Sequence, residues 1–347
     1  MIYTEKRSAR FGDAILIFAL LLRLLVGIVV SKVWAEEPQT VFRPHRPAGG
    51  VSLGPVLPTQ TVPPVTTMPP STVEPTVPTM PTVPAATVPV IPKITFSQGD
   101  MGYVKVRYGT DCGYRAELEA LLLRPLDWQL NSDEPTVLIV HSHATESFTR
   151  QPGQDYKETS EYRTRDTDYN MVAVGDLLAQ QLRQLGIGVV HDRQLHDDPS
   201  YSSAYANSRK SVEQYLQEYP SIRLVLDLHR DAALNADGSQ YATSATIDGQ
   251  QAAQIMLLAG TDWKGGSHPG WQENLALALK LQVLLEQAHP GITRRTLVRG
   301  SIFNQDLCGG MLIVEMGTAG NTLQETLRAV PPLAKAIAAL ANGAEGG

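Results

Sequence analysis

The sequence predicts an α/β fold: a mostly parallel, twisted sheet with helices on both faces, preceded by a transmembrane helix and a disordered Pro/Thr-rich linker. Two observations predict the folded part. Short β-branched runs alternate with helical patterns from Thr136 onward, and three of these runs end in histidine or carboxylate residues. Such alternation is typical of parallel sheets with right-handed crossover helices. An apolar run followed by a proline-rich stretch predicts the N-terminal part.

The N-terminal apolar run extends from Ala14 to Val30 and is interrupted by Arg23, and three basic residues precede it. This length and this basic flank predict a signal-anchor over residues 1–35, with the N-terminus in the cytoplasm and the rest of the chain outside the cell membrane. Small residues before Glu36 resemble a signal-peptidase site, so a cleaved signal peptide remains the alternative.

Residues 36–93 consist largely of proline, threonine and valine. Proline removes backbone donors and fixes φ, so this stretch cannot form a core, and we expect an extended spacer. Folded character resumes at Ile94, and one catalytic domain is expected over residues 94–347. Within it, residues 94–131 are interpreted as a preamble and residues 132–347 as the core.

Charge and cysteine content limit the possible partners. The formal net charge of −6 gives no basic surface for phosphate contacts, which argues against nucleic acid. Cys112 and Cys308 lie far apart and outside any CxxC motif, which argues against a structural zinc knuckle. Whether they form a disulfide is left open, because pairing depends on geometry that the sequence does not give.

The expected elements follow from hydrophobic periodicity and from glycine and proline breaks. Strands are expected at Tyr103–Tyr108, Val137–His141, Ile187–His191, Ile222–Leu228 and Met311–Glu315, with a further strand pair around Tyr241–Ile247 and Ala253–Ala259. Helices are expected at Ala116–Leu123, Asp168–Leu185, Ala206–Glu218, Glu273–Gln287 and Thr322–Leu340.

Polar residues follow three of the apolar strands. The strand from Val137 runs into His141-Ser-His143-Ala-Thr-Glu146, the next core strand ends in His229, and the strand from Met311 ends in Glu315. Because the carboxyl ends of parallel strands share one edge of the sheet, we expect these side chains to converge. Two histidines and a glutamate can hold a catalytic zinc ion, and a nearby carboxylate that is not a ligand can act as general acid and base. The candidate metal ligands are therefore His141, His143, Glu146 and His229, and the candidate catalytic residue is Glu315.

Several assignments within this site stay open. His141 and His143 compete for one ligand position, and the other histidine of the pair is then a group that orients the site. Asp166 is an alternative carboxylate ligand to Glu146. Arg230 and Asp231 are either an ion pair or substrate contacts. The remaining core histidines show no comparable arrangement and are interpreted as surface or packing residues: His191, His196, His268 and His289.

Other chemistries are disfavoured by missing motifs. The sequence contains no GxSxG nucleophile elbow, and Cys308 lies in a glycine-rich segment without an evident partner histidine. No GxGxxG or GxxxxGK[ST] follows a strand, so nucleotide binding is not indicated.

Taken together, several segments resemble one family. They are HSHATESF after the first core strand, VVHD from Val189, Tyr201 and Tyr205 with Arg209, LDLHRDA from Leu226, and FNQDLCGGMLIVEMGTAGNT from Phe303. In order and spacing these segments are similar to stage II sporulation protein P, from about Ile94 to the C-terminus.

The resemblance implies a phosphorylase/hydrolase-like fold of the zinc amidase type, and a membrane-anchored, zinc-dependent N-acetylmuramoyl-L-alanine amidase that remodels peptidoglycan during engulfment, with an endopeptidase activity on peptide cross-links. It implies a complex with a sporulation lytic transglycosylase and a membrane protein of the same stage. It places the zinc ligands in the HxHxxE segment and at His229, the catalytic carboxylate at Glu315, and Asn304 and Gln305 in the substrate groove. Two other readings remain: an exported zinc carboxypeptidase or other peptidase, and a non-catalytic module that binds peptidoglycan.

Overall fold

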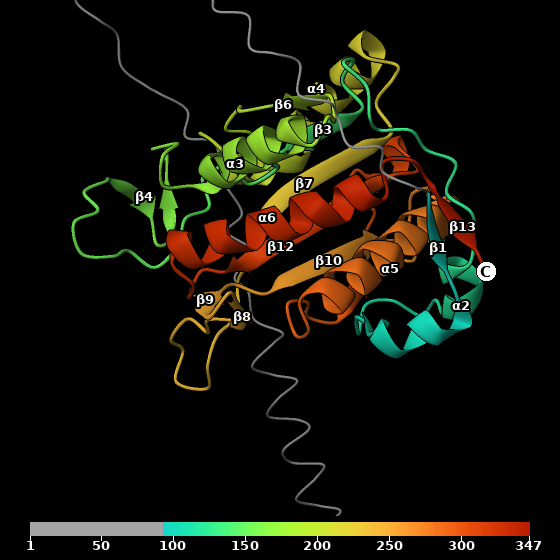
Figure 1. Ribbon diagram of the computed structural model, residues 1–347. Coiled ribbons are helices and arrows are strands. Elements are labelled where there is room, and N and C mark those ends of the chain that lie inside the picture. The colour runs from blue at the N-terminus through green and yellow to red at the C-terminus, as the bar shows by residue number, and fades with distance from the viewer. Residues whose placement is uncertain (1–92) are drawn as a thin grey trace, which may run out of the picture. The chain divides into compact units, whose positions relative to one another are not determined.

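The computed structural model describes residues 93–347, which form a seven-stranded sheet with helices on both faces (Figure 1). The strand order is β2-β11-β10-β12-β7-β3-β6. Every neighbouring pair is parallel except β10 and β12, which are antiparallel. The prediction of a mostly parallel α/β sheet is thus confirmed, although β2, β11 and β10 run opposite to the other four strands.

The strands of this sheet are β2 (Val106–Tyr108), β3 (Val137–Val140), β6 (Val189–His191), β7 (Leu224–Asp231), β10 (Ile255–Gly260), β11 (Thr296–Arg299) and β12 (Met311–Thr318). Three small sheets accompany it: β1 (Ile94–Phe96) with β13 (Ala344–Gly346), β4 (Glu158–Ser160) with β5 (Arg163–Thr164), and β8 (Ala245–Ile247) with β9 (Gln250–Ala252). The helices are α2 (Leu118–Leu122), α3 (Met171–Gln184), α4 (Ala204–Glu218), α5 (Trp271–Ala288) and α6 (Leu323–Ala339), with 3₁₀ turns η1 (Gln98–Tyr103), η2 (Tyr201–Ser203) and η3 (Gln305–Leu307).

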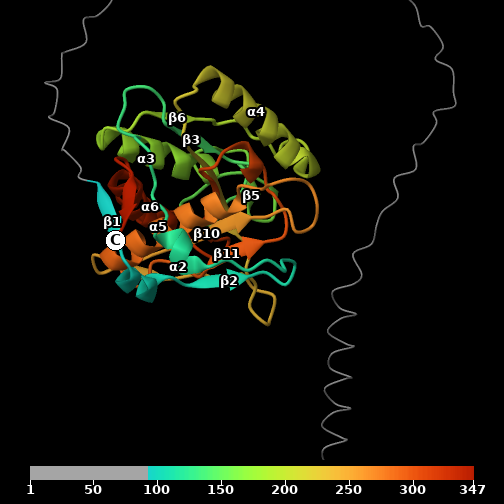
Figure 2. The ribbon, with the colours of Figure 1, turned by 90° about the vertical axis from the view of Figure 1, so that its right-hand side faces the viewer.

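The helices cover the two faces of the sheet unequally. Helices α3, α6 and α5 lie side by side on one face, over the large core cluster (Figure 1), whereas α4 packs on the opposite face (Figure 2). Strand residues alternate between the faces. In β3, Val137 and Ile139 belong to the large core, whereas Leu138 and Val140 pack towards α4. Tyr205 of α4 and Phe303 of the loop after β11 also pack on this second face, against Met256, Leu258, Leu297 and Ile313.

The ends of α6 show how local sequence sets an element boundary. Thr322 accepts a hydrogen bond from Glu325 N, and the Glu325 carboxylate accepts one from Thr322 N, which is a complete capping box. This pattern agrees with the predicted start of the C-terminal helix. Each predicted long helix is present, with boundaries that differ by a few residues.

One expectation about strand pairing was wrong. The segment Tyr241–Ile247 does not pair with Ala253–Ala259: β8 forms a hairpin with β9, and β10 enters the main sheet beside β12. Strand β11 was not predicted, because its four residues lack a long apolar run. In the segment 94–131, β2 pairs with β11 and extends the main sheet.

The predicted signal-anchor and linker lie outside the described residues. Among the helices of residues 93–347, none is long and apolar enough to cross a membrane. Cys112 and Cys308 are both free thiols.

Helix α5 contains an unusual buried lysine. Lys280 is 1% exposed, its ammonium group donates to Leu122 O, and it lies 4.9 Å from the centre of the Phe96 ring. Burial, together with the charge of Arg124, lowers the pKa of Lys280 to about 8. The lysine thereby links α5 to the end of α2 and to β1, at the cost of desolvating a charge.

This burial predicts a specific pH dependence of stability. Above pH 8 the folded state loses the Lys280 proton while the unfolded chain keeps it up to about pH 10.5, so the free energy of unfolding should rise with pH in that window. In Lys280→Met this rise, at most about 3 kcal/mol, should be absent in urea denaturation measured between pH 8 and 10. Lys335→Met removes an exposed lysine of α6 and should keep the wild-type dependence. Identical slopes for wild type and Lys280→Met would contradict this account.

Candidate functional site

The candidate site lies where β3, β7 and β12 end on the α4 face of the sheet. Register pairs Glu315 of β12 with His229 of β7, and Asp227 of β7 with Val140 of β3. Within β7, Asp227 and His229 alternate with Leu226 and Leu228, which belong to the large core. The pleat therefore directs Asp227, His229 and Glu315 to the same face, as predicted for converging strand ends.

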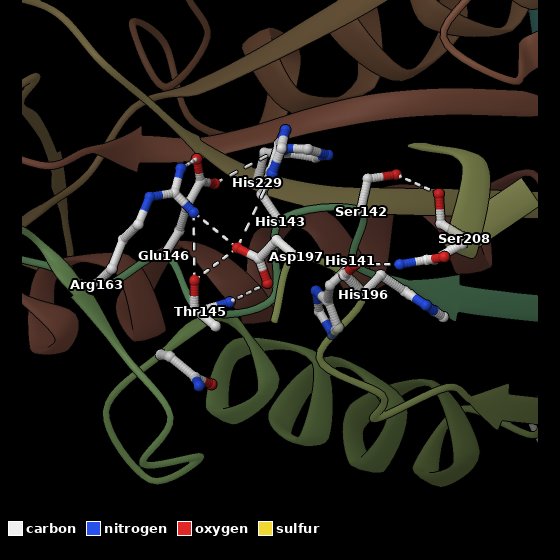
Figure 3. Close-up of polar contacts among 12 residues, drawn as sticks. His141, Ser142, His143, Thr145, Glu146, Arg163, His196, Asp197, Ser208 and His229 are labelled. Atoms are coloured by element: carbon white, nitrogen blue, oxygen red, sulfur yellow. Dashed lines mark hydrogen bonds and ion pairs between the residues drawn. The ribbon is translucent and has the colours of Figure 1, made fainter. Parts of the chain in front are cut away.

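Two histidines and a glutamate form the centre of the site (Figure 3). His143 and His229 lie with ring centroids 5.3 Å apart in an edge-on arrangement, and His229 Nδ1 lies 3.6 Å from Glu146 Oε2. All three side chains are buried. His143 Nδ1 has no hydrogen-bond partner, which leaves a buried imidazole nitrogen free to bind a further group.

Asp227 lies beside His229 and fixes the neighbouring loop. Its carboxylate accepts hydrogen bonds from Ser142 N at 2.7 Å and Ser142 Oγ at 2.6 Å. His229 Nε2 lies 2.9 Å from Asp227 Oδ1, but without hydrogen-bond geometry, so Nε2 has no hydrogen-bond partner either. Burial opposes protonation of His229, but Asp227, Glu146 and Glu315 outweigh it and raise the pKa of His229 to about 10.

Glu315 is enclosed in the same region. Its Oε2 is buried without a hydrogen-bond partner. Burial raises the pKa of Glu315 to about 8; His229 opposes this shift, while Asp231 and Glu146 add to it. A carboxyl group with this pKa can hold or release a proton near neutral pH, which is the property required of a general acid and base.

A cationic bridge holds the loops around Glu146 (Figure 3). Arg163, from β5, donates to Asp197 Oδ2 at 2.7 Å and to Glu146 Oε1 at 3.2 Å. Asp197 also accepts from the backbone and hydroxyl of Thr145 and lies 3.9 Å from His143 Nδ1. Three loops that are distant in sequence are therefore fixed to one another at the edge of the site.

Two tyrosines cover the imidazoles from the α4 side. The Tyr201 ring stacks on His143 with centroids 4.4 Å apart, and the Tyr205 ring lies edge-on to His143 at 5.5 Å and stacked with His229 at 6.4 Å. Burial, together with the carboxylates of Asp227 and Glu315, raises the pKa of the Tyr205 phenol, so that it stays protonated.

His141 is not brought together with the other candidate ligands. Its Nδ1 lies 3.1 Å from Leu228 O and its Nε2 lies 2.8 Å from His191 Nε2, beneath α3. A side chain at Gly175 of α3 would collide with both rings, which explains the glycine at that position. Burial, with the neighbouring His191, lowers the pKa of His141 to about 3, so the ring stays neutral. Of the pair left open by the sequence, only His143 faces His229 and Glu146.

The other predicted polar residues are engaged with the protein. Arg230 donates to Ser147 O and Tyr162 O, and its guanidinium lies 3.5 Å from Glu146. Asp231 does not pair with it but with Arg294, at 2.7 Å. Asp166 is exposed in the turn before α3, where it accepts from Asp168 N.

The two residues predicted in the substrate groove lie after β11. Asn304 lines a cavity beside the site, and its amide donates to Tyr205 O and Ser208 Oγ. The Gln305 side chain is buried, accepts from Gly260 N and donates to Leu258 O, so its amide anchors the loop to β10. Among the other histidines, His196 binds Asp192 and His268 contacts Asn274.

The side chains of His143, Glu146 and His229 fit a metal ion in kind but not in arrangement. Within residues 93–347, no three His, Cys, Asp or Glu side chains are positioned as metal ligands. Glu146 is turned towards Arg163 and Arg230 N. In kind, however, two imidazoles and a carboxylate suit zinc. The buried His143 Nδ1 has no hydrogen-bond partner and is a nitrogen that a cation would satisfy, whereas His229 turns Nδ1 towards Glu146 and Nε2 towards Asp227.

Sequence reasoning missed Asp227, Arg163 and Asp197. The position of Asp227 was predictable, because a residue two positions before His229 in a strand points to the same face of the sheet. The positions of Arg163 and Asp197 were not predictable. Arg163 lies in a short hairpin and Asp197 in a loop, neither has a periodic sequence pattern, and only the folded chain brings them together.

Sequence comparison matches residues 94–338 to the family described as stage II sporulation protein P. The stage II sporulation protein P of Bacillus subtilis (strain 168) is 29% identical over 212 residues, which are 58% of this chain and 50% of the relative. The chain thus spans about half the length of that curated relative.

Two solved structures are similar to part of the chain. An N-acetylmuramoyl-L-alanine amidase from Clostridium difficile 630 has a TM-score of 0.35 and 16% identity, over 60% of this chain and 94% of that chain. The CwlD amidase from Clostridioides difficile, in complex with the GerS lipoprotein, has a TM-score of 0.36 and 12% identity, over 58% and 94%. TM-scores this low reflect limited superposition. The family match, by contrast, extends over most of the chain and includes every residue of the site described above, so the chain belongs to the stage II sporulation protein P family.

Proposed function

We propose that this chain is a cell-wall hydrolase that cleaves the amide bond between N-acetylmuramic acid and L-alanine of peptidoglycan during sporulation. The observation that carries the proposal is the convergence of His143, Glu146 and His229 with Glu315, whose Oε2 is buried and has no hydrogen-bond partner. Membership of the stage II sporulation protein P family supports a role in the cell wall during sporulation.

In this proposal His143, Glu146 and His229 hold a zinc ion, which when bound supplies an acidified water and polarises the scissile carbonyl. In this proposal Glu315 accepts a proton from the water that attacks the scissile carbonyl. The C–N bond then breaks, and Glu315 returns the proton to the leaving amine of L-alanine, which balances the hydrolysis. Asp227 positions His229, while Arg163 and Arg230 orient Glu146.

The cellular setting is also a proposal. Residues 1–35 would anchor the chain in the cell membrane, residues 36–93 would act as the spacer, and the catalytic domain would lie outside the cytoplasm. Cleavage of peptide cross-links, and a complex with a lytic transglycosylase and a membrane protein of the same sporulation stage, belong to the same proposal.

The first prediction of the proposed function separates the two histidines of the HSH segment. With the zinc-loaded full chain on purified peptidoglycan, we expect the wild type to release new L-alanine amino termini, detectable by mass spectrometry. His143→Gln should lose bound zinc and more than about 100-fold of this activity. His141→Gln is the matched control and should retain stoichiometric zinc, because its side chain contacts Leu228 and His191 instead.

Two results would count against this proposal. If His141→Gln rather than His143→Gln releases the zinc, the ligand assignment is wrong. If the zinc-loaded wild type produces no L-alanine termini but other peptide ends, the chain is a peptidase rather than an amidase.

The second prediction concerns the proton on Glu315 in chelator-treated protein. Between about pH 4.5 and 8 the folded state keeps this proton while the unfolded chain loses it, so the stability that Glu315 contributes falls as pH rises. In Glu315→Gln the free energy of unfolding should lack this fall, which amounts to a few kcal/mol at most, in urea denaturation from pH 5 to 8. Glu119→Gln changes an exposed carboxylate of α2 and should follow the wild type. Parallel curves for wild type and Glu315→Gln would show that Glu315 is already ionised in the fold.

A further inference from the structure

A cavity of about 580 Å³ opens beside the site, between α4 and the loop that follows β11. Its walls include the aromatic rings of Tyr205 and Phe303, the side chain of Ile302, and the neutral polar side chains of Ser267, Ser301 and Asn304. We call this cavity the side groove. Its volume is in the range of small-ligand sites.

The side groove is continuous with the candidate site through one side chain. The Tyr205 ring lies 5.5 Å from His143 on one side and 5.7 Å from Phe303 on the other, measured between centroids. A ligand portion resting on Phe303 therefore lies about one aromatic ring away from the imidazoles. In the proposed substrate, the lactyl group joins the sugar ring to the scissile carbonyl, so a sugar on Phe303 and a carbonyl beside the imidazoles can belong to the same muramoyl unit.

The side groove is electrically neutral. The charged residues that line it, Arg209 and Asp306, are joined to each other by two hydrogen bonds of 2.9 Å, and Arg209 also contacts Glu213 at 3.0 Å. Arg209 is thus not available to bind a ligand carboxylate. A stem peptide carries free carboxylates and would need unpaired cations. A sugar is uncharged, and its C–H face can pack on an aromatic ring while its hydroxyls bind neutral polar groups.

The backbone that presents Phe303 is unusual. Phe303 and Asn304 both have left-handed φ values, 53° and 61°, which non-glycine residues rarely adopt. The conformation is maintained from two sides: Asn304 donates to Tyr205 O of α4, and the Gln305 side chain bonds to β10. Strain of this kind persists where the surroundings over-determine it, and it is concentrated at ligand sites. Here it holds the Phe303 ring at the wall of the side groove.

We propose that the side groove binds an N-acetylated sugar ring of the glycan strand, with Phe303 as the stacking platform, so that the glycan lies along α4 and the stem peptide lies away from it. This inference rests on the proposed function and gives the substrate an orientation in the site. It makes Phe303 a residue that determines specificity, in a segment for which sequence reasoning had predicted only that Asn304 and Gln305 line the groove.

The test is calorimetric titration of the full chain with two probes, chitotetraose as a glycan without peptide and the free stem tetrapeptide. We expect chitotetraose to bind the wild type, and Phe303→Leu to weaken that binding at least about 10-fold because the aromatic face is lost. Binding of the stem tetrapeptide should change less than about 2-fold. Ser267→Trp, which fills the side groove from an exposed position, should have the same effect without touching the core. Tyr103→Leu removes an exposed ring in η1 and is the matched control.

The proposal is overturned if chitotetraose does not bind the wild type, if it binds Phe303→Leu and Ser267→Trp as tightly as the wild type, or if these variants weaken the tetrapeptide instead. Hydrolysis of peptidoglycan by the wild type is measured in parallel. If the wild type hydrolyses peptidoglycan but Phe303→Leu binds chitotetraose as tightly as the wild type does, only the side-groove proposal fails. If binding depends on Phe303 but the zinc-loaded wild type releases no L-alanine termini, the side groove stands and the amidase proposal fails.

Discussion

The pairing register of β12, β7 and β3 decides what the candidate site contains. It places Glu315 opposite His229 and Asp227 opposite Val140, so that the three strand ends meet on the α4 face. Side chains alternate with a period of two, so a slip of one residue in β12 would turn Glu315 into the core beneath α6. The apolar residues on either side of it, Val314 and Met316, are fully buried in that core. Packing of the opposite face therefore fixes the Glu315 carboxylate in place.

Much of the fold was predictable because it depends on local pattern. The run VLIV before His141 is buried at every position, as expected for an inner strand covered on both faces. The long helices follow the 3.6-residue period and end near glycine or proline. The antiparallel pairing of β10 with β12 was not predictable, because it depends on which strand β10 lies beside in the folded sheet. Strand β11 has only four residues, and its extended conformation is stabilised by hydrogen bonds to β10 on one side and β2 on the other.

The candidate site was also predictable only in part. Because parallel strands align their carboxyl ends at one edge of the sheet, the sequence predicted that the side chains of four residues lie close together: His143, Glu146, His229 and Glu315. The choice between His141 and His143 needed the structure, since it depends on the close approach of α3 at Gly175, a contact between segments far apart in sequence. Arg163 comes from β5, the Tyr201 ring from η2 and the Tyr205 ring from α4, and only the folded chain brings them together.

Charge balance gives the site its final constraint. The region holds four carboxyl groups, those of Glu146, Asp197, Asp227 and Glu315. Arg163 pairs with Glu146 and Asp197, Arg230 lies beside Glu146, and Asp227 lies beside His229. The fold compensates with protons, since the pKa values of His229 and Glu315 are raised to about 10 and about 8. A buried region that retains these protons at neutral pH is one in which additional positive charge is favourable. These protons offset the excess of carboxylates. We infer that a divalent cation that binds here would replace them, with His229 and Glu315 as the groups that release protons. The proton content of the region and its capacity for a cation would then both follow from the carboxylates that the strand register assembles.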